Sequence, residues 1–349
     1  MRYAGYTEEL LEEIFITKNL HINQEESQKI TLRSVYEYVS SLQDSVKAWY
    51  TIFNPQDSDF SADIVLWLDK LSRIGMDSYL PFTLIVLQKT KSEKQKAAYL
   101  KTIERNLFVF YFFSHYFGGQ YGSVIDPQGI DLAIDLHTGK ASLEKIIKVI
   151  TEKTTAYVSH KSIKTATAKF KMYGFYEWPH IRYFLYEHNL HLQEGTKTDR
   201  ANIFWPEFIE QGSDFITVEH IYPQQARHPY WTERFGGINP KQRVACRNSL
   251  GNLLPLSKRK NSSLSNKPFL EKVAGADGSL VSYRYGSYAE KEVAELEEWT
   301  PTHVLKRGKK LLDFLETRWD IKLGGEEQKA AMLSMNFPIS SVRKNPRAT

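Results

Sequence analysis

Residues 215–224 read FITVEHIYPQ, and residues 250–272 read LGNLLPLSKRKNSSLSNKPFLEK. The first stretch is rich in β-branched and aromatic residues and is closed by Pro223, which predicts a strand. The apolar run Leu250–Leu256 predicts a second short strand, and residues 261–272 predict a helix. The order over residues 215–272 is therefore two strands followed by a helix.

Both sides of this block read as helices. Residues 1 to about 200 are helical in pattern, and residues 79–88 (YLPFTLIVLQ) are apolar nearly all round, which predicts a central buried helix. Thr31 is placed to cap a segment in which apolar residues recur with a helical period, so one buried face is expected there. Those positions are Leu32, Val35, Tyr36, Val39 and Leu42. The expected fold class is α+β and predominantly helical.

Residues 288–320 also predict a helix, and the tail from Gly324 is expected to fray. The apolar side of this helix holds Val304, Leu311, Leu312, Leu315 and Trp319. The aromatic-rich residues 108–117 are interpreted as core rather than as a base-stacking surface, since they crowd one helix.

The composition excludes several classes of protein. With 349 residues, 42% of them hydrophobic, the chain can bury a core and is not a disordered protein. The single cysteine, Cys246, excludes an internal disulfide and a zinc ribbon and is expected to be a passive thiol. The apolar run at residues 107–113 is far shorter than the roughly 20 residues of a membrane span. The amino terminus lacks a signal-peptide pattern, so a cytoplasmic protein is expected.

The positive charge is concentrated in one place. The chain carries a formal charge of +5, and residues 241–272 hold eight Lys and Arg against one acid, Glu271. A charge run is usually a solvated face, but this one adjoins the strand-strand-helix block, where it favours contact with nucleic-acid phosphates. The residues chosen for DNA binding are Lys258, Arg259, Lys260 and Lys267.

Glu219 and His220 supply the groups that phosphodiester hydrolysis needs. Histidine is a base with a pKa near neutrality, and a carboxylate can hold the divalent cation that stabilises charge on the phosphate. Adjacent strand residues point to opposite faces, so the two groups can serve water and cation separately.

Two asparagines complete the candidate site. Asn261 can supply an amide oxygen to the same cation, or it can cap the helix. Asn252, on the second strand, can orient His220 by a hydrogen bond, or it can be a turn residue after Gly251. Asn248 competes with Asn252 for the middle role.

The pattern EHIYPQ…LGNLLPLSKRKNSSLSN…F resembles the HNH, or His-Me finger, nucleases. More closely, it resembles domain of unknown function 1524, found in the C-terminal part of GmrSD-type restriction and anti-phage effectors. It is also similar to the HNH domain of the RNA-guided CRISPR nuclease, in which the nine-residue step from Asn252 to Asn261 has a counterpart.

The resemblance implies a ββα-metal core embedded in a helical chain. It implies His220 as general base, Glu219 and Asn261 as ligands of Mg²⁺ or Mn²⁺, and Asn252 as the middle asparagine, all four as catalytic residues. Zinc is not expected. The expected organisation is a helical linker or partner-docking domain over 1–200, a nuclease domain over 201–322 and a flexible tail over 323–349.

The resemblance also implies partners and a reaction. A unit of the domain of unknown function 262 type, which hydrolyses nucleotides, usually precedes this nuclease, so a separate subunit or domain of that type is expected, with DNA as substrate and no membrane partner. The expected function is a metal-dependent DNA endonuclease in restriction of foreign or modified DNA. The alternatives are a catalytically weak DNA-binding subunit of a split nucleotide-dependent defence complex, and an RNA-directed HNH nuclease.

The remaining histidines give a weaker signal. His188 and His191 lie three residues apart and can share a helix face, but no carboxylate is spaced to complete a metal site. A cation at this pair is therefore disfavoured.

Overall fold

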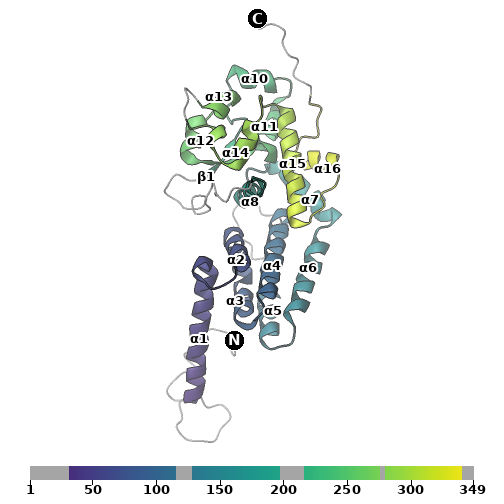
Figure 1. Ribbon diagram of the computed structural model, residues 1–349. Coiled ribbons are helices and arrows are strands. Elements are labelled where there is room, and N and C mark those ends of the chain that lie inside the picture. Colours follow the sequence, from purple (N-terminus) through teal and green to yellow (C-terminus); the bar gives the residue numbers. More distant parts are fainter. Residues whose placement is uncertain (1–30, 115–127, 197–215, 276–279, 340–349) are drawn as a thin grey trace. The chain divides into compact units, whose positions relative to one another are not determined.

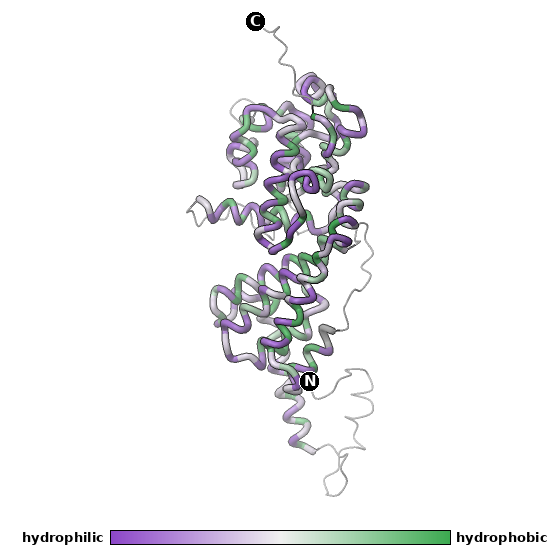
Figure 2. The backbone as a smooth tube through the Cα atoms, turned by 90° about the vertical axis from the view of Figure 1, so that its right-hand side faces the viewer, coloured by the Kyte–Doolittle hydropathy of each residue, from purple (hydrophilic) through white to green (hydrophobic). Residues whose placement is uncertain are grey.

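The computed structural model describes residues 31–114, 128–196, 216–275 and 280–339 (Figure 1). The chain forms two compact units, the first comprising Met1–Leu107 and Gly122–Thr155, the second Phe108–Tyr121 and Ala156–Thr349. Hydrophobic and hydrophilic residues alternate along the helices, as expected of elements that bury one face (Figure 2). Within the described ranges, no helix is both long and apolar enough to cross a bilayer.

The first unit is helical. Its central helix is α3, in which residues Phe82–Leu87 are all buried, so the prediction of a central buried helix is confirmed. Pro81 lies in the first turn of α3, where its missing N–H is least costly. The elements are α1 (Leu32–Phe53), η3 (Pro55–Asp57), α2 (Ala62–Ile74), η4 (Asp77–Tyr79), α3 (Leu80–Lys89), most of α4 (Glu93–Phe113), α5 (Gln128–His137) and α6 (Leu143–Tyr157).

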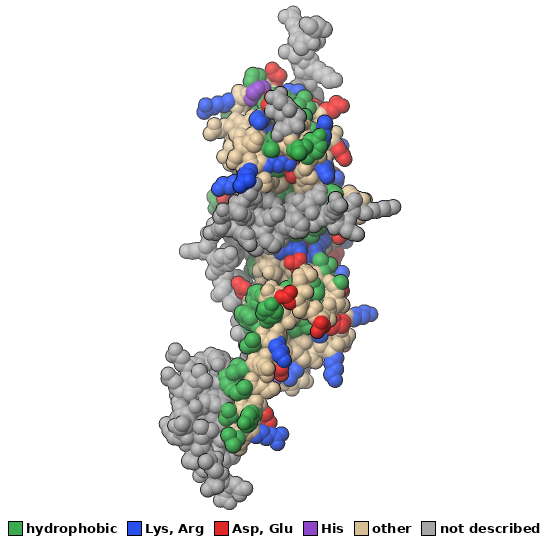
Figure 3. Space-filling model, turned by 60° about the vertical axis from the view of Figure 1, so that its left-hand side comes forward, with side chains coloured by type: hydrophobic (Ala, Val, Ile, Leu, Met, Phe, Trp, Pro, Cys, Tyr) green, Lys and Arg blue, Asp and Glu red, His purple; other side chains and the backbone are tan. Residues whose placement is uncertain are grey.

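Helix α1 differs from its prediction on one point. Thr31 caps it as expected, because its hydroxyl accepts a hydrogen bond from Ser34 N at 3.1 Å. The side facing α3 carries Ser45, whose hydroxyl accepts from Gln88 Nε2 at 3.3 Å. The apolar stripe lies elsewhere and is exposed (Figure 3). The prediction of a buried apolar face is therefore wrong for Leu32, Tyr36, Val39 and Leu42.

The second unit holds the sheet and the aromatic core. Phe108 stacks on Trp319 and contacts Trp178 edge-on, and Phe112 and Phe113 are also buried, so the core prediction is confirmed for these three phenylalanines. Phe110 and Tyr111 are half-buried, and Tyr116 and Phe117 lie outside the described residues. Its further elements are α7 (His160–Tyr173), α8 (Ile181–Glu194), β1 (Ile216–His220), α10 (Pro229–Phe235), α11 (Pro240–Asn248), η5 (Leu250–Asn252), β2 (Leu253–Ser257), α12 (Lys258–Leu264), α13 (Phe269–Ala274), η7 (Tyr283–Tyr285), α14 (Tyr288–Ala294), α15 (Pro301–Trp319) and α16 (Glu326–Met332).

Three helical boundaries differ from the predictions. The helix expected over 261–272 is two helices, α12 and α13, since the chain turns at Ser265 with φ 37° and Pro268 precedes α13. The helix expected over 288–320 is also divided, because α15 begins anew at Pro301. The expected fraying from Gly324 is wrong as far as Met332, since α16 forms there and its Lys329 binds Asp313 at 2.5 Å.

The sheet positions the site. Strands β1 and β2 pair antiparallel, with Glu219 opposite Leu254 and His220 opposite Leu253, and α12 begins directly after β2. The predicted two strands and a helix are thus present, although β2 begins three residues later than expected, at Leu253.

Helix α15 supports the approach to β2. Gly251 lies so close to α15 that a Cβ atom would overlap Val304 O and the backbone of Gly308. From the next turn, Arg307 Nη1 donates to Gly251 O at 2.8 Å and to Leu253 O at 2.9 Å. The glycine therefore allows the strand with Asn252 to sit against the helix. All five apolar positions predicted on α15 are buried.

Candidate functional site

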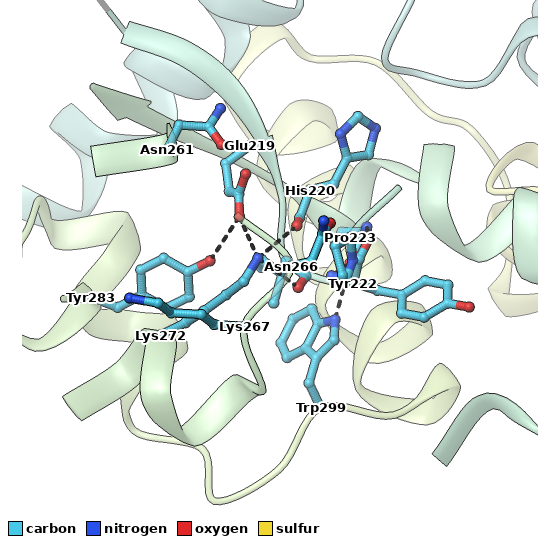
Figure 4. Close-up of polar contacts among 12 residues, drawn as sticks. Glu219, His220, Tyr222, Pro223, Asn261, Asn266, Lys267, Lys272, Tyr283 and Trp299 are labelled. Carbon is cyan, nitrogen blue, oxygen red and sulfur yellow. Dashed lines mark hydrogen bonds and ion pairs between the residues drawn. The ribbon is translucent and has the colours of Figure 1, made fainter. Parts of the chain in front are cut away.

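A cavity of about 330 Å³ opens beside the end of β1. Glu219 and His220 both line it from the last two positions of the strand, and Asn261 lines it from α12. In Figure 4 the Asn261 amide lies beside the Glu219 carboxylate, whereas the His220 ring points away from that carboxylate. The structure therefore brings three of the four predicted catalytic residues to one cavity.

Glu219 is buried against a lysine that the sequence did not single out. Lys272 Nζ, from α13, lies 2.5 Å from Glu219 Oε1, and Tyr283 donates its hydroxyl to the same oxygen at 3.4 Å (Figure 4). Burial raises the pKa of Glu219, and the charge of Lys272 opposes that rise. Burial likewise lowers the pKa of Lys272, opposed by Glu219. The short contact is that of an ion pair.

The imidazole of His220 is neutral at physiological pH. Burial lowers its pKa to about 4, while a hydrogen bond with the Asn248 side chain acts in the opposite direction. The ring of Tyr176 lies against the imidazole, with ring centroids 4.4 Å apart. Among the described residues, nothing hydrogen-bonds the buried Nε2 atom of His220. A buried nitrogen without a protein partner is costly unless water or a bound group satisfies it.

Asn252 does not orient the histidine ring as predicted. It ends η5 rather than lying on β2, and its side chain is fully buried. Its Oδ1 accepts from Tyr222 N at 2.7 Å and from Trp299 Nε1 at 3.0 Å, and its Nδ2 donates to Tyr222 O at 3.0 Å and Arg247 O at 2.9 Å. All its donors and acceptors are thus used: two bonds hold Tyr222, in the chain that follows His220, and the other two bind Arg247 O and Trp299 Nε1.

Asn248, the competing residue of the sequence analysis, is the asparagine that bonds the histidine side chain. It lies at the end of α11, where its carbonyl accepts from Phe175 N at 2.8 Å. Gly174 approaches it so closely, with φ +74°, that a side chain there would meet Asn248. The α7–α8 connection thus positions both Asn248 and Tyr176 against His220.

Asn261 does not cap α12. Ser257 does so, because its side chain accepts from Lys260 N. The Asn261 Nδ2 instead donates to Thr217 Oγ1 at 2.6 Å, across to β1. This bond fixes the amide so that its oxygen faces the side of Glu219 (Figure 4).

An oxygen-binding cation suits this pair of side chains. Mg²⁺ and Mn²⁺ take carboxylate and amide oxygens, and Mg²⁺ keeps several waters besides one or two protein ligands. Within the described ranges, no group of three or more His, Cys, Asp and Glu could hold a metal ion. The donors at hand are Glu219 and Asn261, which suit a hard, partly hydrated cation.

The four predicted DNA-binding residues have different environments. Lys258 and Arg259 are exposed at the start of α12, and Lys258 lines the cavity. Lys267 is half-buried. Lys260 forms an ion pair with Glu290, a buried residue of α14. This pairing argues against the predicted contact of Lys260 with DNA. Lys272, counted in the same basic segment, is fully buried.

Other candidate groups are structural. His188 is buried, and burial lowers its pKa to about 3, so its imidazole is neutral in the fold. Cys246 is buried, and burial raises the pKa of its thiol to about 12, which makes it an inert thiol as expected.

The sequence missed Lys272, Tyr283 and Tyr176. Their roles depend on contacts between residues far apart in the chain: Lys272 and Tyr283 follow Glu219 by 53 and 64 positions. A lysine at the end of a basic run gives no signal of burial. Of the residues that contact His220, the sequence pointed only to Asn248, as the competitor of Asn252.

Comparison with known proteins gives one match. Residues 158–314 match the model of the family described as GmrSD restriction endonucleases, C-terminal domain. No curated protein and no solved structure matches the chain. The match includes every residue that lines the cavity. The predicted resemblance is therefore confirmed over this part of the chain: residues 158–314 are similar to the C-terminal domain of GmrSD restriction endonucleases.

Proposed function

We propose that this chain is a metal-dependent DNA endonuclease of the HNH type that acts in restriction of foreign or modified DNA. The observation that carries the proposal is the convergence of Glu219, His220 and Asn261 on one cavity. The family match over the same residues supports a restriction-type nuclease and a DNA substrate.

Glu219 and Asn261 would hold the divalent cation, Mg²⁺ or Mn²⁺. A bound cation of this kind supplies positive charge to the phosphate and to the leaving oxygen. The hydrogen bond from Asn261 to Thr217 and the ion pair of Glu219 with Lys272 fix the two ligands before a cation arrives. Such fixing removes the entropy cost of ordering them during the reaction.

His220 would take the proton from the attacking water. Its low pKa, about 4, keeps the imidazole neutral and able to accept a proton. An anionic phosphodiester in the cavity raises that pKa toward neutrality, where general bases work best. Asn248 and Tyr176 would hold the imidazole ring in place beside the cavity.

Lys258 and Arg259 would contact the DNA backbone at the cavity edge. Both are exposed on the first turn of α12, next to Asn261 on the same helix. Contacts of this type position a duplex without reading its sequence. Target choice and nucleotide hydrolysis would then lie with a separate subunit or domain.

The proposal is tested by incubating the purified chain with supercoiled plasmid and with a structured RNA, in Mg²⁺, Mn²⁺ or EDTA. We expect nicked or linear plasmid in the metal-containing samples and none in EDTA. Cleavage of the RNA alone would favour the RNA-directed alternative. DNA binding without cleavage in either metal, with a nucleotide-hydrolysing partner present, would favour the binding-subunit alternative.

A further inference from the structure

Lys272 is the one cation, within the described ranges, that contacts the Glu219 carboxylate, and its environment is complete without a metal. Its ammonium has three N–H groups and three oxygen neighbours. These are Glu219 Oε1 at 2.5 Å, His220 O at 3.2 Å and Ile221 O at 3.3 Å. One buried lysine thus binds both the proposed cation ligand and the backbone of the proposed base.

Both side-chain hydrogen bonds that Glu219 accepts within the described ranges go to the same carboxylate oxygen. Lys272 and Tyr283 both donate to Oε1. In Figure 4 the other carboxylate oxygen lies on the side of Asn261. Lys272 therefore fixes the direction of the carboxylate while the oxygen nearest Asn261 remains on the cavity side.

The charge of Lys272 has a second effect. A lysine 2.5 Å from a carboxylate largely neutralises it, and it repels a divalent cation bound through the other oxygen of the same carboxylate. Because the pair is buried, solvent screens this repulsion poorly. The same lysine that orients Glu219 must then lower the affinity of the site for the cation.

We propose that Lys272 is a resident counter-ion and positioning residue for Glu219, which orients the carboxylate and keeps cation binding weak and reversible. This inference rests on the proposed function, because it assigns Glu219 to the cation. Lys272 itself touches neither phosphate nor water in this account.

The test measures Mn²⁺ affinity by electron paramagnetic resonance, and thermal unfolding with and without Mn²⁺, in the full chain. We expect Lys272→Met to bind Mn²⁺ about tenfold more tightly than the parent or better. Its melting temperature without metal falls, and Mn²⁺ raises it by more than it raises that of the parent. A dissociation constant that is unchanged or weaker in Lys272→Met would overturn the inference.

Lys329→Met is the matched control. Lys329 is also a buried lysine between two carboxylates, Asp313 at 2.5 Å and Glu316 at 2.6 Å, but it does not line the cavity. Its replacement should lower the melting temperature and leave Mn²⁺ affinity unchanged. An equal gain of affinity in Lys329→Met would overturn the inference, since a general charge effect would then explain both.

Glu219→Gln separates this inference from the proposed function. If Glu219→Gln binds Mn²⁺ as tightly as the parent does, the proposed metal site is wrong, and so is the inference that rests on it. If Glu219→Gln loses Mn²⁺ but Lys272→Met gains nothing, only the inference is wrong.

A crystal of the parent soaked in Mn²⁺ decides the matter if Lys272→Met does not fold. An anomalous peak on Glu219 Oε2, with Lys272 still on Oε1, supports the proposal. A peak on Oε1 with Lys272 displaced contradicts it.

Discussion

Asn252 and Tyr222 exchange two hydrogen bonds, from Tyr222 N to Asn252 Oδ1 at 2.7 Å and from Asn252 Nδ2 to Tyr222 O at 3.0 Å. Ile221 N adds a third bond, to Asn252 O at 3.0 Å. The turn after His220 is therefore fixed by its backbone. Asn252 positions His220, the proposed base, by holding the backbone that follows it, whereas Asn248 positions His220 by a hydrogen bond to its imidazole ring.

This difference predicts different effects for the two asparagines. Asn252→Ala leaves buried donors and acceptors of Tyr222, Trp299 and Arg247 without partners, so we expect a loss of about 2–5 kcal/mol of stability. Asn248→Ala removes a half-buried side chain and should lower plasmid cleavage with a much smaller loss of stability. Thermal unfolding and nicking assays on both variants check this. Equal melting temperatures for the two would contradict the assignment.

The contact between Gly251 and α15 predicts a severe effect of adding one methyl group. A Cβ at residue 251 would overlap backbone atoms of Val304 and Gly308, which cannot move independently. We expect Gly251→Ala to cost about 3 kcal/mol or more, or to prevent folding of the second unit. Gly237→Ala is the control, since a Cβ there meets nothing within 4 Å. Comparable melting temperatures would show that α15 does not pack here as described.

Burial of His188, on α8, predicts that the free energy of unfolding decreases in acid, independently of the candidate site. Burial lowers the pKa of His188 from 6.5 to about 3 in the folded chain. The unfolded chain takes up a proton on this side chain below pH 6.5 and the folded chain does not, so stability falls as the pH drops from 6.5 toward 3. Each such group contributes about 1.4 kcal/mol per pH unit within that window. His188→Gln should reduce the dependence of the free energy of unfolding on pH by about 1.4 kcal/mol per pH unit. Denaturant unfolding between pH 4.5 and 6 measures this. An unchanged slope would mean that His188 titrates normally.

The basic run on α12 predicts two separable effects. Lys258 is exposed at the cavity, so Lys258→Ala should weaken DNA binding and make it less dependent on salt. Lys260 is paired with buried Glu290, so Lys260→Ala should mainly lower the melting temperature. Fluorescence anisotropy at several salt concentrations and thermal unfolding measure these. A loss of DNA affinity in Lys260→Ala as large as that in Lys258→Ala would restore Lys260 to the DNA surface.

Local pattern in the sequence predicted the elements of this fold well, because capping, apolar period and strand propensity act within a few residues. Thr31 at the start of α1 and the buried α3 are examples. The pattern failed where a second segment decides the outcome. The apolar residues on α1 recur with a helical period, but this period alone does not determine whether another part of the chain packs against them. The breaks before α13 and α15 come at prolines inside otherwise helical patterns.

The site was predictable as far as its motif extends. The sequence proposed Glu219, His220 and Asn261 by residue type and spacing, and their meeting at one cavity depends only on the pairing of β1 and β2 and on α12. The groups that tune them come from elsewhere: Lys272 from α13, Tyr283 from η7 and Tyr176 from the α7–α8 connection. The role of Asn252 was misjudged because three of its four side-chain bonds go to backbone atoms, which every residue has, and the fourth goes to Trp299, 47 positions away.

The central claim is that His220 activates water in this cavity, and plasmid nicking tests it most directly. Parent, His220→Ala and His191→Ala, an exposed-histidine control, are compared at equal concentration in Mg²⁺ or Mn²⁺. We predict that His220→Ala slows nicking at least 100-fold while its melting temperature is maintained, the scale expected for loss of a general base. We predict parental activity for His191→Ala. Nicking by His220→Ala at the parental rate would contradict the account.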